Sequence, residues 1–409
     1  MGFSQAVSGL NAASNNLDVI GNNIANSATV GFKSGTVSFA DMFAGSKVGM
    51  GTQVAAVMQD FSNGTVTSSS RELDIAISGN GFFRVQDANG SVYYSRNGQF
   101  TLDGSRNIVN MQGMQLTGYP ATGTPPTIQQ GADPVALSIP EDAMQAQATT
   151  VASIIANLNS SDEVKTWDAA NAADTSNYKG SITTYDSLGN AHDFALYFVK
   201  NDIATTPPTN TGATAVWSVY VQDTSVDGSD FLPAYQMEFS SNGALLNTEP
   251  MAVAVEPLNG SDGVDFTLSF AGSLQQNSDS STKTPTQNGY APGELTGYSI
   301  NDDGTVVGTY SNQKQQVLGQ IVLASFANPE GLSPEGDNVW SATDNSGQAV
   351  VNIAGTGNLG KLIGQATESS NVDMSKELVN MIVAQRNYQA NSQTIKTQDS
   401  ILQTLVSLR

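Results

Sequence analysis

Cysteine is absent from this 409-residue chain, so neither disulfides nor Cys-ligated metals hold its fold together. Histidine occurs only at position 192, which leaves no pair of histidines to bind a metal ion. Basic residues are scarce: 16 Lys and Arg stand against 37 Asp and Glu, for a net charge of −21. Nucleic acids and anionic membrane surfaces both require a basic face. We therefore expect no binding to nucleic acid or to an anionic membrane surface; the hydrophobic pattern, described next, predicts no membrane insertion.

Long hydrophobic runs are also missing. No stretch approaches the roughly 20 apolar residues that a membrane-spanning helix needs. The first 32 residues contain no Lys or Arg and no apolar core, whereas a cleavable secretory signal has both. The sequence thus predicts a chain that is either cytoplasmic or exported without a cleavable signal peptide.

The N-terminal segment has the apolar spacing of an amphipathic helix. Its apolar positions alternate by three and four residues, as a coiled-coil seam requires. Gly9, Gly21 and a cluster of Asn residues each weaken such a helix by up to about 1 kcal/mol relative to Ala. We expect this helix to be frayed unless a partner orders it. The seam positions are Phe3, Ala6, Leu10, Ala13, Leu17, Ile20 and Ile24.

The C-terminal segment, residues 372–409, lacks Gly and Pro and predicts a long helix that Asp373 or Ser375 could cap. One apolar series recurs every seven residues, and a second, partly polar series alternates with it. The two ends of the chain are therefore predicted to pair. The alternative is two ordinary core helices of a helical domain. The first series is Met374, Met381, Tyr388, Ile395 and Leu402, and the second is Leu378, Gln385, Ser392, Asp399 and Val406.

Between the ends, the pattern changes to the alternation of β-strands. Residues 73–85, "LDIAISGNGFFRV", predict a strand, a Gly-Asn-Gly turn and a second strand. Residues 181–201 predict a hairpin that turns at Ser187–Asn190. The predicted fold is mainly β with long terminal α-helices, in a nested order. It comprises paired terminal helices at 1–33 and 370–409, an extended connector at 34–70, a discontinuous inner β-domain at 71–145 and 286–369, and an inserted outer β-domain at 146–285.

Several of these segments resemble one known family. Residues 15–33, "NNLDVIGNNIANSATVGFK", and 370–405, "SNVDMSKELVNMIVAQRNYQANSQTIKTQDSILQTL", are similar to the two ends of the flagellar axial family of rod, hook and hook-associated proteins. "LDIAISGNGFFRV", "YYSRNGQFTLDG" and "GQIVLASFANPEGLSPEGDNVWSATDNSG" are similar to its inner β-domain. The resemblance covers about two thirds of the chain.

The resemblance implies a structural subunit. The inserted block at 146–285 favours the hook branch of the family over the rod branch, because rod proteins lack such a block. A hook subunit is implied to polymerise helically into a curved, flexible, hollow tube that transmits motor torque from rod to filament. Its implied partners are further copies of itself, the distal rod protein, the hook-cap and hook–filament junction proteins and the flagellar type III export machinery. Its implied location is the extracellular hook.

The same resemblance implies which residues pack between subunits. Asn22, Asn23 and Asn26 also suit a helix end, where Asn tolerates the left-handed conformation. The motif positions are Leu10, Leu17, Asn22, Asn23, Ile24, Asn26, Gly31 and Phe32 at one end, and Asn371, Glu377, Gln385, Arg386, Tyr388 and Asn391 at the other. The seam adds Phe3, Ile20, Met374, Leu378, Met381, Ile395, Leu402 and Val406.

No pattern indicates catalysis or a cofactor. The glycines of "AVVNIAGTGNLGKL", residues 349–362, imitate a nucleotide loop, but Leu362 replaces the hydroxyl that would bind Mg²⁺. We interpret this segment as a turn-rich β-edge and His192 as a solvated surface residue. The acidic turns at 301–305 and 223–230 lack the ligand spacing of a calcium loop. The alternatives to a hook subunit are a distal rod protein with an insertion, a secreted β-rich adhesin-like protein and a nucleotide-binding enzyme.

Overall fold

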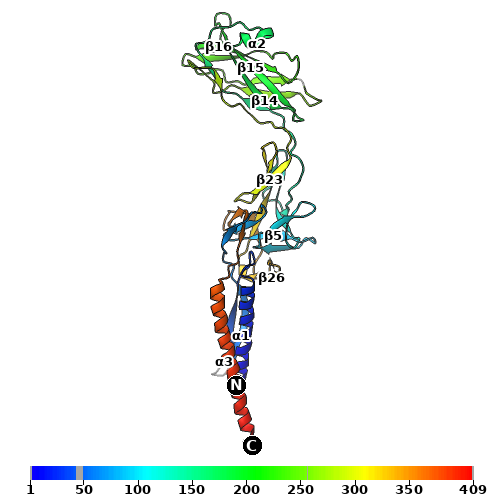
Figure 1. Cartoon of the computed structure of the whole chain (residues 1–409), viewed down its shortest axis with the longest axis vertical. Coiled ribbons are helices and arrows are strands. Elements are labelled where there is room, and N and C mark those ends of the chain that lie inside the picture. Colours follow the sequence, from blue (N-terminus) through cyan, green and yellow to red (C-terminus); the bar gives the residue numbers. More distant parts are fainter. Residues whose placement is uncertain (1, 43–48, 256, 408–409) are drawn as a thin grey trace. The chain divides into compact units, whose positions relative to one another are not determined.

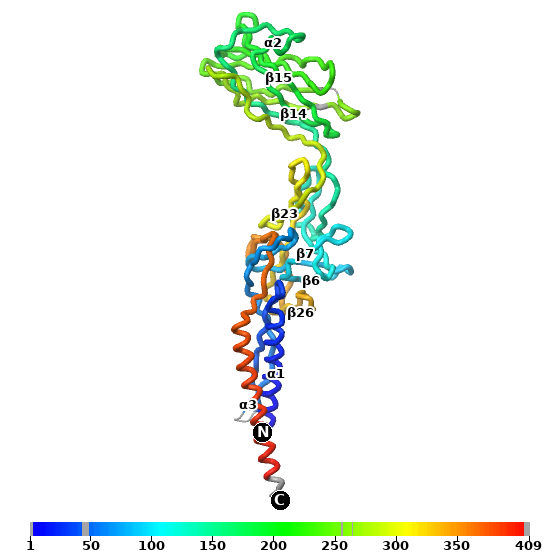
Figure 2. The backbone as a smooth tube through the Cα atoms, in the orientation of Figure 1, coloured from blue at the N-terminus to red at the C-terminus, as the bar shows by residue number. Residues whose placement is uncertain are grey.

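A computed structural model describes residues 2–42, 49–255 and 257–407. As predicted, the fold is mainly β with a helix at each end of the chain (Figures 1 and 2). It divides into two compact units, each described by itself below. Unit 1 comprises residues 1–140, 297–309 and 315–409, and unit 2 comprises 141–296 and 310–314. No helix in the described ranges is long and apolar enough to span a membrane.

The terminal helices α1 (Gly2–Ala25) and α3 (Met374–Ser407) lie side by side in unit 1 (Figure 1). They run antiparallel, because Gly9 of α1 lies against Asn391, whereas Asn23 lies against Glu377. Asp373 caps α3 as predicted: its Oδ1 accepts hydrogen bonds from the backbone N–H groups of residues 375 and 376, at 2.9 and 3.2 Å.

A hairpin of β1 (Gly35–Met42) and β2 (Gly51–Gln59) packs against α1. Its strands pair antiparallel with an irregularity between Ser38 and Phe39. The side chain of Asn23 fixes the base of the hairpin, accepting from the Gly35 N–H at 2.9 Å and donating to the Gly35 carbonyl at 2.8 Å. This segment was predicted as an extended connector; its Val, Thr and Phe content instead supports paired strands.

The β-domain of unit 1 is built on a sheet whose main path has the strand order β23-β24-β25-β9-β5-β6-β27-β26, with β7, β8, β10, β11 and β28 paired beside it. Strand β5 follows the predicted Gly-Asn-Gly turn, and its Phe83 is fully buried beside Phe100. Smaller strand pairs, β29–β4 and β3–β30, join the chain's two halves. The strands are β3 (Val66–Ser68), β4 (Ile75–Ser78), β5 (Phe82–Gln86), β6 (Val92–Ser95), β7 (Phe100–Leu102), β8 (Ile108–Asn110), β9 (Gln115–Thr122), β10 (Thr127–Ile128), β11 (Val135–Ala136), β23 (Leu295–Ile300), β24 (Thr305–Tyr310), β25 (Gln315–Ser325), β26 (Ser333–Gly336), β27 (Val339–Ser341), β28 (Val350–Ile353), β29 (Lys361–Gly364) and β30 (Ala366–Glu368), with a 3-10 turn at Pro329–Gly331.

Unit 2 packs the sheet β14-β15-β16-β17 on strands of two further sheets, β18-β19-β12-β22 and β20-β13-β21. The predicted hairpin is confirmed as β14 and β15, and Phe194, Leu196 and Phe198 all point into the core. The elements are β12 (Val151–Ser153), β13 (Ala156–Asn159), β14 (Tyr178–Tyr185), β15 (Ala191–Asn201), β16 (Ala213–Asp223), β17 (Tyr235–Ser240), β18 (Met251–Val255), β19 (Val264–Ser269), β20 (Leu274–Gln276), β21 (Ser281–Thr282) and β22 (Thr286–Gln287), with a 3-10 turn at Ala169–Asn171 and the short helix α2 (Ala172–Thr175).

The segment at 160–177 covers the second face of the β14–β17 sheet. Its Trp167 ring stacks on Tyr220 with centroids 4.1 Å apart and planes 5° apart. Phe231 meets the same indole edge-on at 5.0 Å. Strand β15 is therefore buried on both faces, which the simple alternation of its sequence did not predict.

Two backbone bridges join the ends of the segment that forms unit 2. Met144 and Gly293 exchange hydrogen bonds of 2.7 and 3.1 Å, and Gln147 and Tyr290 exchange two more. The chain therefore enters and leaves this unit through two adjacent antiparallel segments.

His192 is buried, so its prediction as a surface residue was wrong. Its Nδ1 lies 2.6 Å from Oδ2 of Asp223, and its Nε2 lies 3.6 Å from Oδ2 of Asp186. Burial raises the pKa of Asp186, but hydrogen bonds from Asn190 outweigh it and hold that pKa below its ordinary value. The sequence did contain a signal for burial: His192 is two residues from Phe194 in β15, so both side chains lie on the core-facing side of the strand.

The Gly-rich segment at 349–362 is confirmed as a β-edge. A turn joins β28 to β29, and Leu362 is fully buried opposite Ile77. Among the described residues, no group of His, Asp and Glu is arranged to hold a metal ion.

The carboxyl group of Glu238 is expected to make the stability of unit 2 depend on pH. Its buried carboxylate accepts three hydrogen bonds of 2.7 Å from Thr209 and Asn210. Burial raises the pKa of Glu238, but these bonds outweigh it and lower that pKa below the ordinary value. A lowered folded-state pKa stabilises the fold above the unfolded-state pKa of about 4.3, and this stability is lost as the pH falls through the folded value.

We therefore expect the free energy of unfolding of unit 2 to fall below about pH 4. Glu238→Gln should lower it at pH 7 and flatten its dependence between about pH 5 and 3. Urea unfolding, monitored by hydrogen exchange of peptides from β14–β17, measures the free energy of unfolding and its pH dependence. Glu249→Gln, an exposed carboxyl in the same unit, is the control and should leave the pH dependence unchanged.

Candidate assembly surface on the terminal helices

Small side chains let α1 approach α3 closely. Ala6, Ala13 and Ile20, one of the two predicted series, are buried with 4–8% of their surface exposed. The other series is less covered: Leu10, Leu17 and Ile24 are half-buried, and Phe3 is 49% exposed. The described chain thus uses only part of the predicted α1 seam for its own packing.

The α3 seam differs from the prediction by one residue in its second series. Leu378, Gln385 and Asp399 are exposed, and only Ser392 of the predicted positions is half-buried. Ala384 is the deeply buried residue, since its small side chain allows close helix packing. Glu377 belongs to the seam because Asn23 and Asn380 bind its carboxylate at 3.4 and 3.2 Å. The seam is Glu377, Met381, Ala384, Asn391, Ile395 and Gln398.

The asparagines at the end of α1 do not adopt the predicted left-handed conformation. Asn26 instead donates from its side chain to the side-chain oxygen of Asn22 at 2.7 Å, and Asn23 binds the hairpin. Gly31 is the residue with positive φ, at 71°. A Cβ there would lie 2.6 Å from the backbone of Arg96, so the position requires glycine.

Gly9 of α1 lies close against the Asn391 side chain of α3. An added Cβ would lie 2.9–3.1 Å from three atoms of the Asn391 side chain. We expect Gly9→Leu to force the helices apart. Overpacking should cost about 1–3 kcal/mol, whereas the gain in helix propensity is at most about 1 kcal/mol. Faster hydrogen exchange of α1 in the monomer would report it. Gly21→Leu is the matched control, because an added Cβ meets nothing within 4 Å there; equal exchange in both variants would contradict the prediction.

One flank of α3 borders a groove shared with α1 and β1. The groove has a volume of about 240 Å³. Its lining from α3 includes Asn380 and Val383, and its lining from β1 includes Thr36 and Phe39. Val383 and Phe39 remain 51% and 45% exposed, so the groove presents apolar surface.

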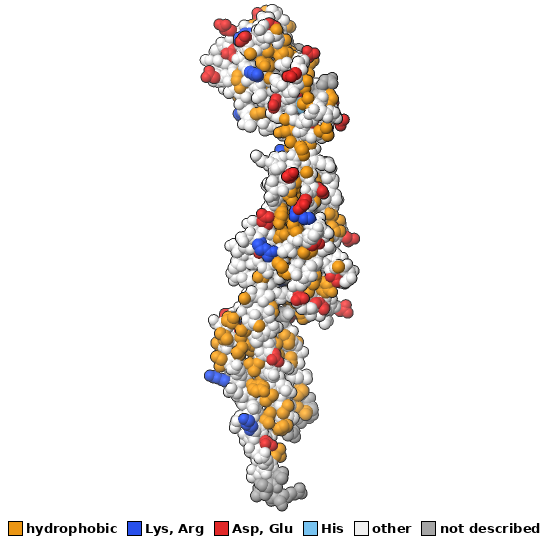
Figure 3. Space-filling view, turned by 45° about the vertical axis from the view of Figure 1, so that its right-hand side comes forward, with side chains coloured by type: hydrophobic (Ala, Val, Ile, Leu, Met, Phe, Trp, Pro, Cys, Tyr) orange, Lys and Arg blue, Asp and Glu red, His pale blue; other side chains and the backbone are white. Residues whose placement is uncertain are grey.

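The opposite flank of α3 is an apolar ridge formed by Leu378 and Ile382, which are 47% and 50% exposed. At about 100° per residue, Ile382 lies about 160° around the helix from Asn380 of the groove. Hydrophobic side chains gather over the terminal helices in Figure 3. α1 carries a single charged residue, Asp18, so little charge opposes close packing there.

The remaining predicted residues differ in how exposed they are. Arg386 and Gln385 are exposed on α3, Phe32 is half-buried, and Met374, Tyr388 and Leu402 are 41%, 37% and 56% exposed. Val406 lies in α3, but its side chain is outside the described part of the chain. Asn371 connects the segments near the helices, accepting from the Ser34 N–H and donating to the Asp60 carbonyl, both at 2.8 Å.

Sequence reasoning did not single out three further residues of this region. Lys33, Arg96 and Glu368 form a buried ionic cluster where the helices meet the β-domain. Their positions in the sequence are far apart, and the only signal was that Lys33 is the first basic residue of the chain.

Four family models match successive parts of the chain. Residues 4–33 match the flagella basal body rod protein, and residues 76–153 match the flagellar hook protein FlgE/F/G D1 domain. Residues 157–290 match the flagellar basal body protein FlaE D2 domain, and residues 363–408 match the flagellar basal body rod FlgEFG protein C-terminal region.

Full-length relatives agree with these matches. The chain is 62% identical over 414 residues to the flagellar hook protein FlgE of Escherichia coli, covering 100% of both chains. It is 33% identical to that of Borreliella burgdorferi, covering 98% of both. The fold also resembles a crystal structure of Helicobacter pylori flagellar hook protein FlgE2, with a TM-score of 0.54 at 13% identity over 74% of this chain and 100% of that one. The chain therefore belongs to the flagellar hook protein family, a family of structural proteins.

Proposed function

We propose that this chain is the subunit of a curved, flexible, hollow tube that transmits torque from the flagellar rod to the filament. In this tube the antiparallel terminal helices form the inner layer, the β-domain of unit 1 the next, and unit 2 the outermost. The proposed domain boundaries are those predicted above. The proposed work is mechanical, without catalysis or a cofactor.

The observation that carries the proposal is the pair of unlike flanks on α3. We propose that the ridge of Leu378 and Ile382 on one copy enters the groove beside Asn380 and Val383 on the next. Ridge and groove are different surfaces, so this contact is heterologous. Heterologous contacts that do not close into a ring extend into helical polymers, whereas a contact between like surfaces gives a closed dimer.

The weak helix-forming sequence of α1 supports assembly-dependent folding. Its Gly and Asn residues disfavour an isolated helix, so pairing with α3 and packing against neighbouring subunits would together supply the missing stabilisation. Such a chain stays unpaired during passage through an export channel. The proposed partners are other copies of itself, the distal rod protein, the hook-cap and hook–filament junction proteins and the type III export machinery, and the proposed place is the extracellular hook.

Negative-stain electron microscopy of the concentrated, purified chain tests this function. We expect curved hollow tubes from the full chain and none from a variant without residues 2–33 and 370–407. Straight rods would favour the second candidate, a distal rod protein with an insertion. Monomers or closed oligomers under all conditions would contradict both and favour a secreted adhesin-like protein.

The absence of cysteine makes the ridge-and-groove contact directly testable. Chains carrying Thr36→Cys in the groove and chains carrying Ile382→Cys on the ridge are mixed, polymerised and oxidised. We expect disulfide-linked dimers from the mixture and few from either chain alone. Efficient cross-linking of Ile382→Cys chains to each other would contradict the heterologous geometry.

A further inference from the structure

A buried ionic cluster lies at the junction between the helix pair and the β-domain of unit 1. Lys33, Arg96 and Glu368, here called the junction cluster, expose only 1–2% of their surfaces. Lys33 follows α1, Glu368 precedes α3, and Arg96 belongs to the β-domain. Three separate segments therefore meet at one point, although Glu368 lies 335 residues from Lys33 and 272 residues from Arg96 in the sequence.

The Glu368 carboxylate is the centre of the junction cluster. Its Oε1 accepts hydrogen bonds of 2.8 Å from Lys33 Nζ and from the Gly64 N–H. Its Oε2 lies 3.1 Å from Nε of Arg96. The backbone carbonyl of Glu368 accepts from the Gly31 N–H at 2.8 Å. One residue thus binds the exit of α1, the segment after the hairpin and the β-domain.

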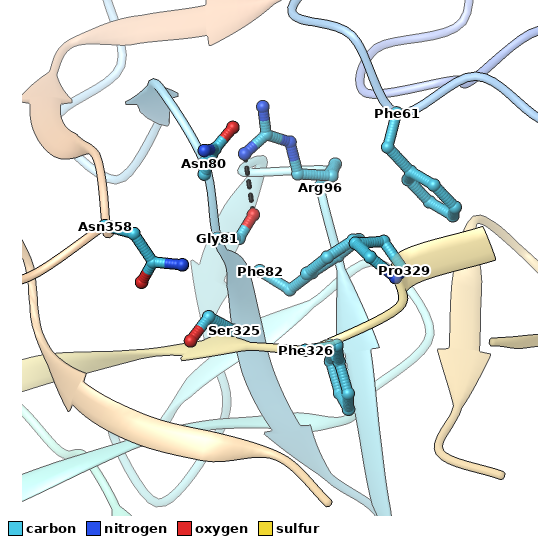
Figure 4. A pocket seen from close by; sticks show the side chains of 9 residues that line it. All are labelled: Phe61, Asn80, Gly81, Phe82, Arg96, Ser325, Phe326, Pro329 and Asn358. Atoms are coloured by element: carbon cyan, nitrogen blue, oxygen red, sulfur yellow. Dashed lines mark hydrogen bonds between the residues drawn. The ribbon is translucent and has the colours of Figure 1, made fainter. Parts of the chain in front are cut away.

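Arg96 anchors the cluster to the β-domain. Its Nη1 donates to the carbonyls of Gly79 and Gly81 at 2.9 and 2.6 Å, and its Nη2 donates to Asn63 Oδ1 at 2.5 Å. Figure 4 shows the guanidinium beside Gly81, at the edge of a pocket lined by Phe61, Phe82 and Phe326. The two glycine carbonyls belong to the turn between β4 and β5, so these bonds fix the guanidinium to the β-domain.

The charge balance makes Glu368 indispensable to the cluster. Two buried cations share one buried carboxylate, so removing its charge leaves Arg96 and Lys33 without a buried counterion, and only the exposed Asp60 still acts on Lys33. Burial is the largest influence on the pKa of Lys33 and lowers it, and the nearby charge of Arg96 lowers it further. The carboxylate of Glu368 raises this pKa but does not offset the other two effects. Complete buried ion pairs add little net stability, but loss of one partner is strongly unfavourable. The cluster is thus better suited to fixing the arrangement of these three segments than to raising the free energy of unfolding.

We propose that the junction cluster couples the ordering of the terminal helices and the hairpin to the folded β-domain, with Glu368 as the positioning residue. The cluster is complete only when both ends of the chain have reached the β-domain. Until then each buried charge is solvated, and the helices are free of the sheet. This inference concerns the single subunit and holds whether or not the assembled object is a curved tube.

Hydrogen exchange of the full-length monomer, below the polymerising concentration, tests the proposal through three variants. Glu368→Gln keeps the shape but removes the charge. We expect peptides from 26–36, 60–66 and 366–373 to exchange at least about tenfold faster, with unit 2 unchanged. Lys33→Met leaves a balanced Arg96–Glu368 pair and should change exchange less. The double variant Lys33→Met with Glu368→Gln removes one unpaired cation and should exchange more slowly than Glu368→Gln alone.

Glu330→Gln, the same change at an exposed carboxyl of the β-domain, is the matched control and should exchange like the unmodified chain. If the cluster acted through packing alone, the double variant would exchange faster than either single variant. That result would overturn the proposal. Unchanged exchange at 26–36 and 366–373 in Glu368→Gln would overturn it as well. If Glu368→Gln fails to fold, the double variant decides: a folded double variant supports the proposal, and an unfolded one overturns it.

Discussion

Replacing Ile382 with glutamate is expected to abolish polymerisation while leaving the monomer folded. Ile382 is 50% exposed on the ridge of α3, and Glu is a good helix former, so the free energy of unfolding should change by less than about 0.5 kcal/mol. In the polymer the same carboxylate would be buried against the apolar groove of the next copy. Burying it unpaired costs several kcal/mol, and each 1.4 kcal/mol raises the required concentration about tenfold.

Light scattering against protein concentration measures the effect, with electron microscopy of the products. We expect the concentration required for polymerisation to rise at least about a hundredfold. Val350→Glu is the control: this side chain is 63% exposed, on β28 of the β-domain, away from ridge and groove. Normal tubes from Ile382→Glu would show that the ridge is not an interface.

Replacing Trp217 with alanine is expected to destabilise unit 2 strongly and to leave the stability of unit 1 unchanged. Trp217 is fully buried on β16 and forms part of a core made only by unit 2 strands. Its Nε1 also donates to Gln275 at 3.3 Å. Truncating such a side chain costs about 3–5 kcal/mol, a large fraction of the 5–15 kcal/mol that stabilise a typical domain.

Differential scanning calorimetry combined with limited proteolysis checks this result. We expect the transition assigned to 141–296 to move down by at least about 5 °C or to disappear, while the other transition stays in place. Trp217→Phe keeps most of the buried ring and should give a much smaller shift. Equal shifts of all transitions would mean that the two units unfold together.

Local patterns in the sequence predicted local structure well. The Asp373 cap and the strand parity of Phe194, Leu196 and Phe198 need only neighbouring residues, and both are confirmed. The Leu362 argument against a nucleotide loop likewise agrees with a strand at that position. Hydrophobic periodicity is sufficient for such features because each depends on one element at a time.

Features that depend on distant residues were missed. Periodicity favoured Leu378 for the α3 seam over Glu377, because nothing in the local sequence reveals that Asn23 binds that carboxylate. His192 was assigned to the surface because it lies at the edge of the predicted hairpin, although it lies on the core-facing side of β15 with Phe194; its contacts with Asp186 and Asp223 are not visible in the local sequence. The junction cluster was missed because Lys33 and Glu368 lie 335 residues apart in the sequence and meet only in the folded chain.

The paired bridges at Met144–Gly293 and Gln147–Tyr290 have a consequence for protein engineering. They hold the two chain ends of unit 2 at the spacing of adjacent antiparallel strands, about 4.5–5.5 Å between Cα atoms. A foreign domain whose termini lie equally close can therefore be grafted between these bridges with little added loop entropy. If the chain polymerises as proposed, each copy would then carry the graft, and the polymer would become a regular scaffold for the display of antigens or enzymes.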